Sequence, residues 1–228
     1  AGVVPGQGAP MGWSRPRTSS SAALPATVTA PKALPWFVPG LDASNYTSST
    51  FPWADYAGAG YRFAIIKATE GDYYTNPTFA AQRSAARSAG MLQGSYHFAN
   101  LRTSAAAQAD LYVDAGGGWT ADGVTLPGVL DVEYDPYSAD PCWGSTAAAT
   151  TSWIAAFDAR YLARTGVHPV IYTTADWWAT CTGSSTAFAA TNPMWTASWA
   201  ASPGALPAGW TSWTLWQSGA DDPLGIDY

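Results

Sequence analysis

Apolar runs rich in β-branched and aromatic residues recur along the chain from residue 36 onward. Eight of them have the length of a strand, and they cover residues 36–42, 61–70, 91–98, 126–134, 168–174, 193–199, 210–217 and 224–228. Most are continuously apolar, without strict alternation, which is typical of strands that are covered on both faces. The pattern therefore predicts a largely parallel sheet.

The segments between the first five runs carry the signals of helices. Residues 76–90, 103–118 and 145–166 are rich in alanine, open on Asn, Thr or Ser, and end in glycine, as capped helices do. Residues 53–60 are expected to form a short helical turn at most, and residues 175–192 one helix. Only about ten residues separate each of the last three strands from the next, too few for a crossover helix. This order predicts a modified TIM-like α/β barrel, with five β/α units followed by three strands with short connections.

The first 35 residues differ in composition from the rest. They mix Pro, Ala, Ser and Thr without a helical or strand period, yet they include the apolar side chains of Met11 and Trp13. We interpret residues 1–35 as a leader that docks in part on the domain formed by residues 36–228. No apolar stretch reaches the ~20 residues of a membrane-spanning helix, and the first residue is Ala1. We therefore expect a mature, secreted extracellular chain without membrane insertion.

Composition and charge exclude two classes of protein. Aromatic residues make up 14% and charged residues 11% of the chain, a balance that excludes wholesale disorder. The chain carries 10 Lys and Arg against 16 Asp and Glu, for a net charge of −6. Because a protein that reads nucleic acid needs a basic surface, we expect no nucleic-acid partner.

Cys142 and Cys181 are the two cysteines of the chain, and they form no CxxC motif and no cluster with histidine. In a chain of this composition we interpret them as one disulfide that closes a long loop. Two buried free thiols remain the alternative. Neither interpretation involves a metal, and we expect no metal site and no cofactor.

The acidic residues gather where the predicted strands end. Asp42 ends the first strand, Glu70 the second and Asp227 the last, while Asp131 and Glu133 lie toward the end of the fourth. Active sites of β/α barrels are built at these carboxyl ends, and residues two apart on a strand share a face. Crowded, partly buried carboxyl groups raise the pKa of at least one member, which then stays protonated as a general acid. Cleavage of a glycosidic bond needs such a proton donor and a second carboxylate.

Aromatic side chains near the predicted strand ends suit the same substrate, because flat amphipathic rings stack on sugars. Most of the 13 Trp are expected in packing, with a few in a cleft. Lys67 is expected either to pair with an acid or to end its strand in solvent, and His97 to be a core histidine with satisfied hydrogen bonds. The residues that we assign to substrate binding are Glu70, Tyr96, Tyr134, Tyr172, Trp199 and Trp216.

Several segments around these residues resemble glycoside hydrolase family 25, the lysozymes or N-acetylmuramidases of actinomycetes, fungi and phages. In the family's order they are GLDAS (40–44), FAIIKATEG (63–71), YTNPTFA (74–80), GSYHFA (94–99), LPGVLDVEY (126–134), HPVIYTT (168–174), TNPMW (191–195) and LWQSG (215–219). They cover roughly residues 36–228. Similarity to the secreted actinomycete branch lies in GGGW (116–119), PCWG (141–144) and LPAGW (206–210).

The resemblance implies hydrolysis of the β-1,4 bond between N-acetylmuramic acid and N-acetylglucosamine in peptidoglycan. It implies that Glu133 is the general acid and that Asp131 positions the substrate's acetamido group. Asp42 and Asp227 match the other active-site aspartates, and Tyr96 matches an active-site tyrosine. The expected partner is then peptidoglycan polysaccharide, the chain is expected to be a monomer, and retention or inversion at the sugar stays open.

Two other functions stay open at this point. A chitinase-like glycosidase also carries DxE on strand four, but its longer DxxDxDxE motif requires an acid where this chain has Val129. A catalytically inactive carbohydrate-binding barrel is the second alternative. Departures from the family pattern around Asn45 and Ser198 keep it open, whereas the joint presence of Asp42, Asp131 and Glu133 argues against it.

Overall fold

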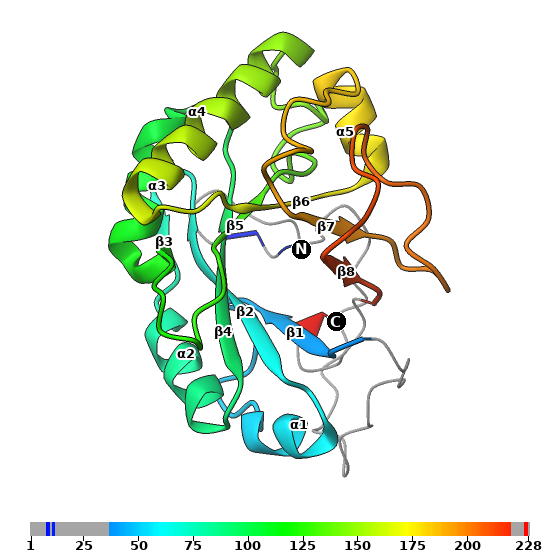
Figure 1. Ribbon diagram of the computed structural model, residues 1–228. Coiled ribbons are helices and arrows are strands. Elements are labelled where there is room, and N and C mark those ends of the chain that lie inside the picture. The colour runs from blue at the N-terminus through cyan, green and yellow to red at the C-terminus, as the bar shows by residue number, and fades with distance from the viewer. Residues whose placement is uncertain (1–7, 10, 12–36, 220–225, 228) are drawn as a thin grey trace.

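One curled sheet organises the chain (Figure 1). The computed structural model describes residues 8, 9, 11, 37–219 and 226–227, the last two by their backbone alone. Its strands are β1 (Gly40–Ala43), β2 (Phe63–Glu70), β3 (Tyr74–Thr75), β4 (Leu92–Phe98), β5 (Val129–Asp131), β6 (Val170–Thr173), β7 (Met194–Ala197), β8 (Leu215–Gln217) and β9 (Ile226–Asp227). Its helices are α1 (Trp53–Ala59), α2 (Phe79–Ser88), α3 (Ala105–Tyr112), the π-helical turn η1 (Val113–Gly117), α4 (Ala147–Thr165) and α5 (Ala175–Thr182).

Each predicted strand segment contains a strand, and β3 is an addition that the pattern did not predict. The strand order is β8-β7-β6-β5-β4-β2-β1-β9, with β3 beside β2. Neighbours from β8 to β1 are parallel, as predicted, but β9 runs antiparallel to β1. The connection from β8 is too short to carry the chain back to the opposite end of the sheet, which a parallel strand would require.

Five α-helices accompany this curled half-barrel in the part of the chain that the structure describes. The three long predicted helices correspond to α2, to α3 with η1, and to α4, and α5 fills part of residues 175–192. The segment expected to be a turn at most is the seven-residue helix α1. In Figure 1, α2, α3 and α4 lie along the outside of the curl. No described helix combines the length and apolarity that are needed to cross a membrane.

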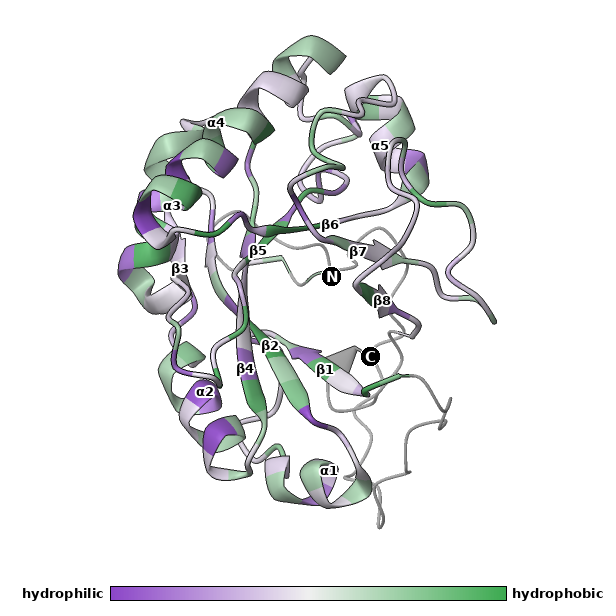
Figure 2. Cartoon of the chain, in the orientation of Figure 1, coloured by the Kyte–Doolittle hydropathy of each residue, from purple (hydrophilic) through white to green (hydrophobic). Residues whose placement is uncertain are grey.

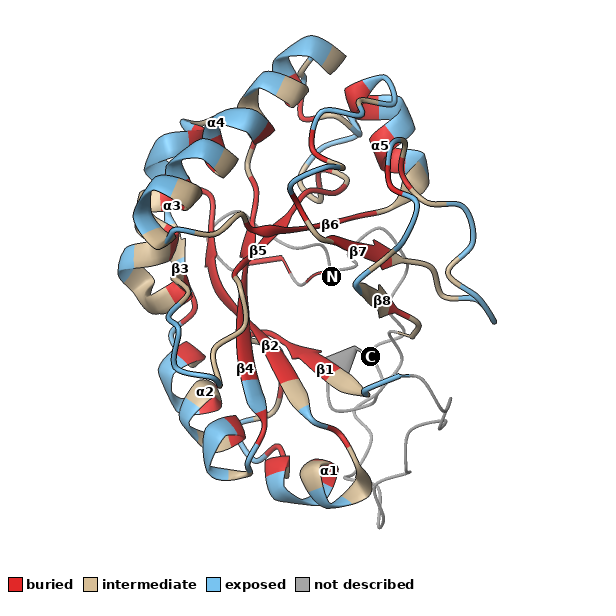
Figure 3. Ribbon diagram, viewed as in Figure 1, coloured by how far each residue is buried: buried red, intermediate tan, exposed pale blue. Residues whose placement is uncertain are grey.

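The central strands are covered on both faces, as their continuous apolar character predicted. Every residue of β2 after Phe63 and of β4 after Leu92 is buried, and so are β5 and β6 throughout. Figure 3 shows these strands as buried and the outer faces of the helices as exposed. In Figure 2 hydrophobic positions run along the strands, with hydrophilic ones interspersed on β1 and β4, while the helices mix hydrophobic and hydrophilic positions.

A stack of rings fills the layer between the sheet and α3–α4. The His97 ring lies 5.2 Å from the ring of Phe157, which in turn stacks on Tyr161. Thr69 Oγ1 lies 2.8 Å from His97 Nδ1, and Gln108 Oε1 lies 2.9 Å from His97 Nε2. His97 is therefore the core histidine that was predicted. Burial, followed by the Lys67 charge, outweighs the Gln108 hydrogen bond and lowers its pKa to about 4.

A disulfide joins the loop after β5 to α5, which confirms the predicted pairing. Cys142 and Cys181 are bonded, with their Cα atoms 5.2 Å apart and 39 positions between them in the sequence. Beside it, Trp177 Nε1 donates to the Pro141 carbonyl at 3.0 Å, and Trp143 Nε1 donates to the Glu133 carbonyl at 3.0 Å. The cross-linked loop thus holds the backbone just beyond the end of β5.

Candidate active site

A β-bulge in β2 brings a lysine and a glutamate to the same face. Lys67 pairs with Tyr96 and Glu70 with Phe98, while the register shifts at Ala68. Residues three apart on a regular strand point to opposite faces, and one extra residue reverses this parity. Lys67 and Glu70 therefore both face the inside of the curl, whereas Thr69 between them faces His97 and the helices.

The predicted carboxylates converge at the carboxyl ends of neighbouring strands. Asp42, Asp131, Glu133 and Glu70 are all buried, with at most 4% of each residue exposed. Charges of Glu133, Asp42 and Glu70 all act on Asp131, so the four groups form one cluster. The backbone of Asp227 pairs with Asp42 in β9, and its side chain lies outside the described residues.

Asp131 is the residue of this cluster that lacks a hydrogen-bond partner. Both of its carboxyl oxygens are buried and accept no hydrogen bond from any residue that the structure describes. Burial is the largest cause that raises the pKa of Asp131 well above its ordinary value, and repulsion by Glu133 adds to it. The Lys67 ammonium opposes this shift without cancelling it. The sequence predicted a raised pKa on at least one carboxyl group, and Asp131 has it.

Glu70 is the opposite case, because donors surround it. Lys67 Nζ lies 2.5 Å from its Oε2, the Tyr73 hydroxyl donates to Oε1 at 2.7 Å, and the Tyr137 hydroxyl donates to Oε1 as well. Burial alone would raise the pKa of Glu70, but the Lys67 charge and these hydrogen bonds lower it overall. Glu70 thus remains a carboxylate. Burial lowers the pKa of Lys67 in spite of this ion pair.

Gln217 links the two sides of the curl. Its Nε2 donates to Asp42 Oδ2 at 2.9 Å, and its Oε1 accepts from the Tyr172 hydroxyl at 2.8 Å and from Trp199 Nε1 at 3.1 Å. One amide of β8 therefore ties the Asp42 carboxylate on β1 to two of the predicted substrate-binding aromatics. Trp199 and Tyr172 are held in fixed orientations as a result.

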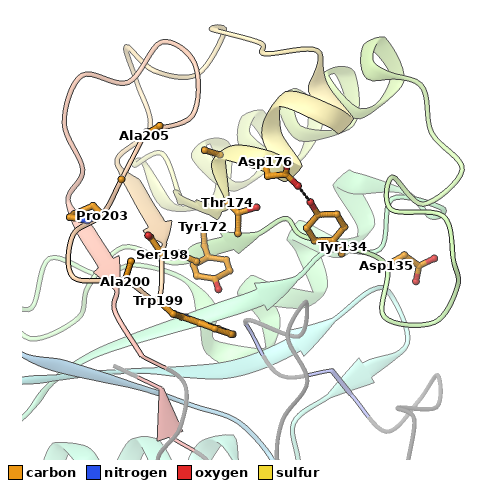
Figure 4. Close-up of a pocket in the computed structure, with 13 residues that line it drawn as sticks. Tyr134, Asp135, Tyr172, Thr174, Asp176, Ser198, Trp199, Ala200, Pro203 and Ala205 are labelled. Carbon is orange, nitrogen blue, oxygen red and sulfur yellow. Dashed lines mark hydrogen bonds between the residues drawn. The ribbon is translucent and has the colours of Figure 1, made fainter.

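A cleft opens between the ends of β5, β6 and β7 (Figure 4), and Tyr172 in its wall is the strand neighbour of Asp131. Its volume of about 770 Å³ lies in the usual range of ligand sites. Tyr134, Tyr172 and Trp199, three of the aromatics assigned to substrate binding, line it, and Figure 4 shows the Tyr134 hydroxyl donating to Asp176. The walls combine ring faces with hydroxyl, indole and carboxylate groups. Such a lining suits a sugar chain.

Trp216, which was also assigned to substrate binding, does not line this cleft. Thr196 pairs with Trp216 and Ala197 with Gln217, and successive residues of a strand face opposite sides. Because Gln217 faces inward, Trp216 faces outward, where its Nε1 donates to the Ser198 carbonyl at 2.7 Å. Its ring packs against Trp213 at 6.3 Å. Trp216 is therefore part of the packing outside β8.

The structure adds three residues that the sequence argument missed or left undecided. Gln217 lies in the LWQSG segment, but a neutral amide carries no charge signal that marks it as a link. Tyr137 lies outside any predicted element, and its hydroxyl contacts Glu70 from 67 positions away. Lys67 pairs with an acid and does not end in solvent. Lys67 and Glu70 lie three residues apart, so the sequence would have suggested this ion pair only if the β-bulge between them were known.

The cluster can supply acid–base chemistry but shows no metal-binding arrangement. Within the described residues, no group of three or more His, Cys, Asp or Glu is placed to hold a metal ion. Burial and the neighbouring charge of Glu133 favour retention of a proton at Asp131. A proton donor, a second carboxylate and an aromatic cleft are the parts that hydrolysis of a glycosidic bond requires.

Comparisons with known proteins agree with this chemistry. The model of the family described as glycosyl hydrolases family 25 matches residues 41–222. An N,O-diacetylmuramidase of Chalaropsis sp is 48% identical over 79% of this chain and 87% of that protein. Lysozyme M1 of Streptomyces globisporus is 46% identical over 82% of this chain and 64% of that protein.

A solved structure extends the likeness to the fold. The muramidase from Trichobolus zukalii superposes with a TM-score of 0.80 at 43% identity, and the match covers 84% of this chain and 93% of that chain. Sequence, cluster geometry and fold thus agree with one another. The chain belongs to glycosyl hydrolase family 25 and is a glycoside hydrolase of the lysozyme type.

Proposed function

We propose that this enzyme cleaves the β-1,4 bond between N-acetylmuramic acid and N-acetylglucosamine in peptidoglycan. Glu133 is the general acid, and Asp131 positions the acetamido group of the substrate. One observation carries the proposal: Asp131 is buried without a hydrogen-bond partner among the described residues, beside Glu133 and next to an aromatic cleft. A buried carboxyl group without a partner costs stability, so its retention here indicates a role in function.

We infer that Asp131 and Glu133 together carry one proton, on one group or the other, since burial and mutual repulsion disfavour two negative charges at this place. In the reactive form the proton lies on Glu133 and passes to the glycosidic oxygen as the bond to the sugar carbon breaks. Asp131, which is ionised in this form, stabilises the positive charge that develops on the sugar and its acetamido group. Water then adds to the sugar carbon, and the proton that it releases returns to Glu133.

The surrounding residues bind and orient the glycan. Tyr134, Tyr172 and Trp199 present ring faces to the sugars, and Gln217 fixes the latter two. Tyr96 and Glu70 bind the substrate on the β2–β4 side of the cluster. Asp42 and Asp227 complete the acid set, and pairing of their backbones brings β9 to the site.

The proposal extends to the organisation of the chain. Residues 36–228 form the catalytic barrel, which consists of five β/α units followed by three strands, with β3 as an insertion. Residues 1–35 form a leader. The enzyme acts outside the cell, because its substrate, the bacterial wall, is extracellular. It acts there as a monomer.

Digestion of purified peptidoglycan tests the proposal, with identification of the sugar at each new reducing end. We expect N-acetylmuramic acid, and no such product from the Glu133→Gln variant. New N-acetylglucosamine ends would refute the assigned bond and support a chitinase-like specificity. Binding of the glycan without any new reducing end would support the inactive carbohydrate-binding barrel.

A further inference from the structure

Part of the N-terminal segment lies inside the mouth of the curl, against the acid cluster. Ala9 and Met11 are completely buried. The Ala9 N–H donates to Glu70 Oε2 at 2.6 Å, and Lys67 Nζ donates to the Ala9 carbonyl. Figure 1 shows this segment in dark blue near the centre of the sheet. The Lys67–Glu70 ion pair thus binds both backbone polar groups of one residue, Ala9.

Two tyrosine hydroxyls hold the segment on either side of Ala9. Tyr46 donates to the Gly8 carbonyl at 2.9 Å, and the Met11 N–H donates to the Tyr96 hydroxyl at 3.2 Å. Gly8 has a φ of +77°, and a Cβ atom there would lie 2.8 Å from the Tyr74 ring. Both the backbone conformation and the close approach therefore require glycine.

All four contacts are made to backbone amide groups. An N-acetylated sugar offers the same N–H and C=O groups on its acetamido substituent, so donors and acceptors that suit one also suit the other. Glu70 and Tyr96, which contact the segment, are residues that we assign to the substrate. A glycan cannot use these groups while the segment occupies them.

We infer that Gly8, Ala9 and Met11 act as an intramolecular inhibitor that occupies the β2–β4 side of the substrate cleft. The cleft lined by Tyr134, Tyr172 and Trp199 stays open in this state, so the chain binds glycan on one side of the cluster only. Release of the segment exposes Glu70, Lys67 and Tyr96 and completes the site. This inference rests on the proposed function, because it takes Glu70 and Tyr96 as contacts of the glycan.

Substitution of Gly8 tests the inference in the full chain. Gly8→Val is incompatible with the positive φ and with the Tyr74 ring, so it releases the segment without altering a residue of the site. Gly123→Val is the matched control, because Gly123 has a φ of +75° and its added Cβ would meet nothing within 4 Å. We expect Gly8→Val to raise kcat/KM on peptidoglycan at least ~10-fold, the gain for a segment docked about nine-tenths of the time. Gly123→Val should leave kcat/KM unchanged.

A second measurement keeps the N-terminal segment unaltered. In the full chain carrying Glu133→Gln, which prevents turnover, hydrogen exchange at the Ala9 and Met11 amides is followed while a soluble peptidoglycan tetrasaccharide is added. Both amides are hydrogen-bonded and buried, so they should exchange slowly in the free protein. We expect their exchange to accelerate as the saccharide saturates the site, because the two compete.

Three results overturn the inference. The first is an unchanged kcat/KM in a Gly8→Val chain whose hydrogen exchange shows that the segment is released. The second is a saccharide that saturates the site without changing exchange at the Ala9 and Met11 amides. The third is rapid exchange of both amides in the free protein. Failure of the proposed function has a different signature. In that case neither chain cleaves peptidoglycan, yet Gly8→Val still binds the tetrasaccharide at least ~10-fold more tightly if the segment blocks the cleft.

Discussion

Two buried ionisable residues lie on neighbouring strands, His97 on the outer face of β4 and Asp131 on the inner face of β5. Both ring nitrogens of His97 have partners, Thr69 and Gln108, and burial lowers its pKa to about 4, so the ring is neutral. Asp131 has no hydrogen-bond partner among the described residues, and burial with repulsion by Glu133 raises its pKa. The outer face thus satisfies its buried polar group, while the inner face leaves one ready for a substrate. The buried polar group on the outer face contributes to the stability of the fold, whereas the one on the inner face serves the function of the site.

The largest effect that we expect is on catalysis, from Glu133→Gln. The substitution keeps the shape of the side chain but removes the proton that it transfers, a contribution of about 10²–10⁴-fold for general acid catalysis. The rate of release of reducing ends from peptidoglycan measures this. Near-normal release by a folded Glu133→Gln chain would show that another group is the acid.

The disulfide should affect stability more than chemistry. Joining Cys142 to Cys181 across 39 positions contributes up to about 4 kcal/mol in the chain-entropy model. Replacing both cysteines by serine should lower the midpoint of urea unfolding, and the pKa of Asp131 should remain raised because its causes lie elsewhere. A normal pKa for Asp131 in a folded double variant would show instead that the cross-linked loop shapes the cluster.

On the outer face, Gln108→Leu should destabilise the protein without a loss of specific activity. The substitution removes hydrogen bonds to His97 and to the Asn100 and Thr103 region, and it leaves buried donors and acceptors unpaired at a cost of about 1–3 kcal/mol. Chemical unfolding and kcat/KM, measured on the same preparation, check both parts. A large fall in kcat/KM at unchanged stability would mean that the two faces are not independent.

On the inner face, Asp131→Asn should have the reverse effect, with activity lost and stability gained at neutral pH. The folded-state pKa of Asp131 lies above its unfolded value, so its favourable contribution is complete below the unfolded pKa and is lost as the pH rises. Asparagine avoids this loss, which amounts to about 1.4 kcal/mol for each unit of raised pKa. The stability difference between variant and wild type should therefore grow from pH 4 to pH 7, as thermal unfolding at several pH values will measure. A constant difference would contradict the raised pKa.

Much of this comparison could be predicted from the sequence, because strand ends follow from apolar runs. The positions of Asp42, Asp131 and Glu133 at carboxyl ends needed only the strand pattern and a two-residue spacing. Glu70 was placed at its strand end correctly, but its pairing with Lys67 depends on a bulge at Ala68. A bulge arises from contacts with neighbouring strands, and no residue type in FAIIKATEG marks it.

The parts that could not be predicted depend on residues far apart in the sequence. Gln217 contacts Asp42 across 175 positions, and the direction of β9 is set by where a short connection meets β1. The direction of the Trp216 side chain could not be predicted for the same reason, because only pairing with β7 decides which face of this three-residue strand a residue occupies. Aromatic character near a strand end shows that a ring is present, and only the register shows which way it points.

The most direct test of the account is the titration of the Asp131 carboxyl group in the full chain, followed by its carbon NMR signal. We predict a pKa well above the ordinary value of about 4 for aspartate, and a lower pKa in Glu133→Gln, because Glu133 is one cause of the shift. An Asp131 that titrates at its ordinary pKa, or that titrates identically with and without Glu133, would contradict the shared proton on which the proposed chemistry depends.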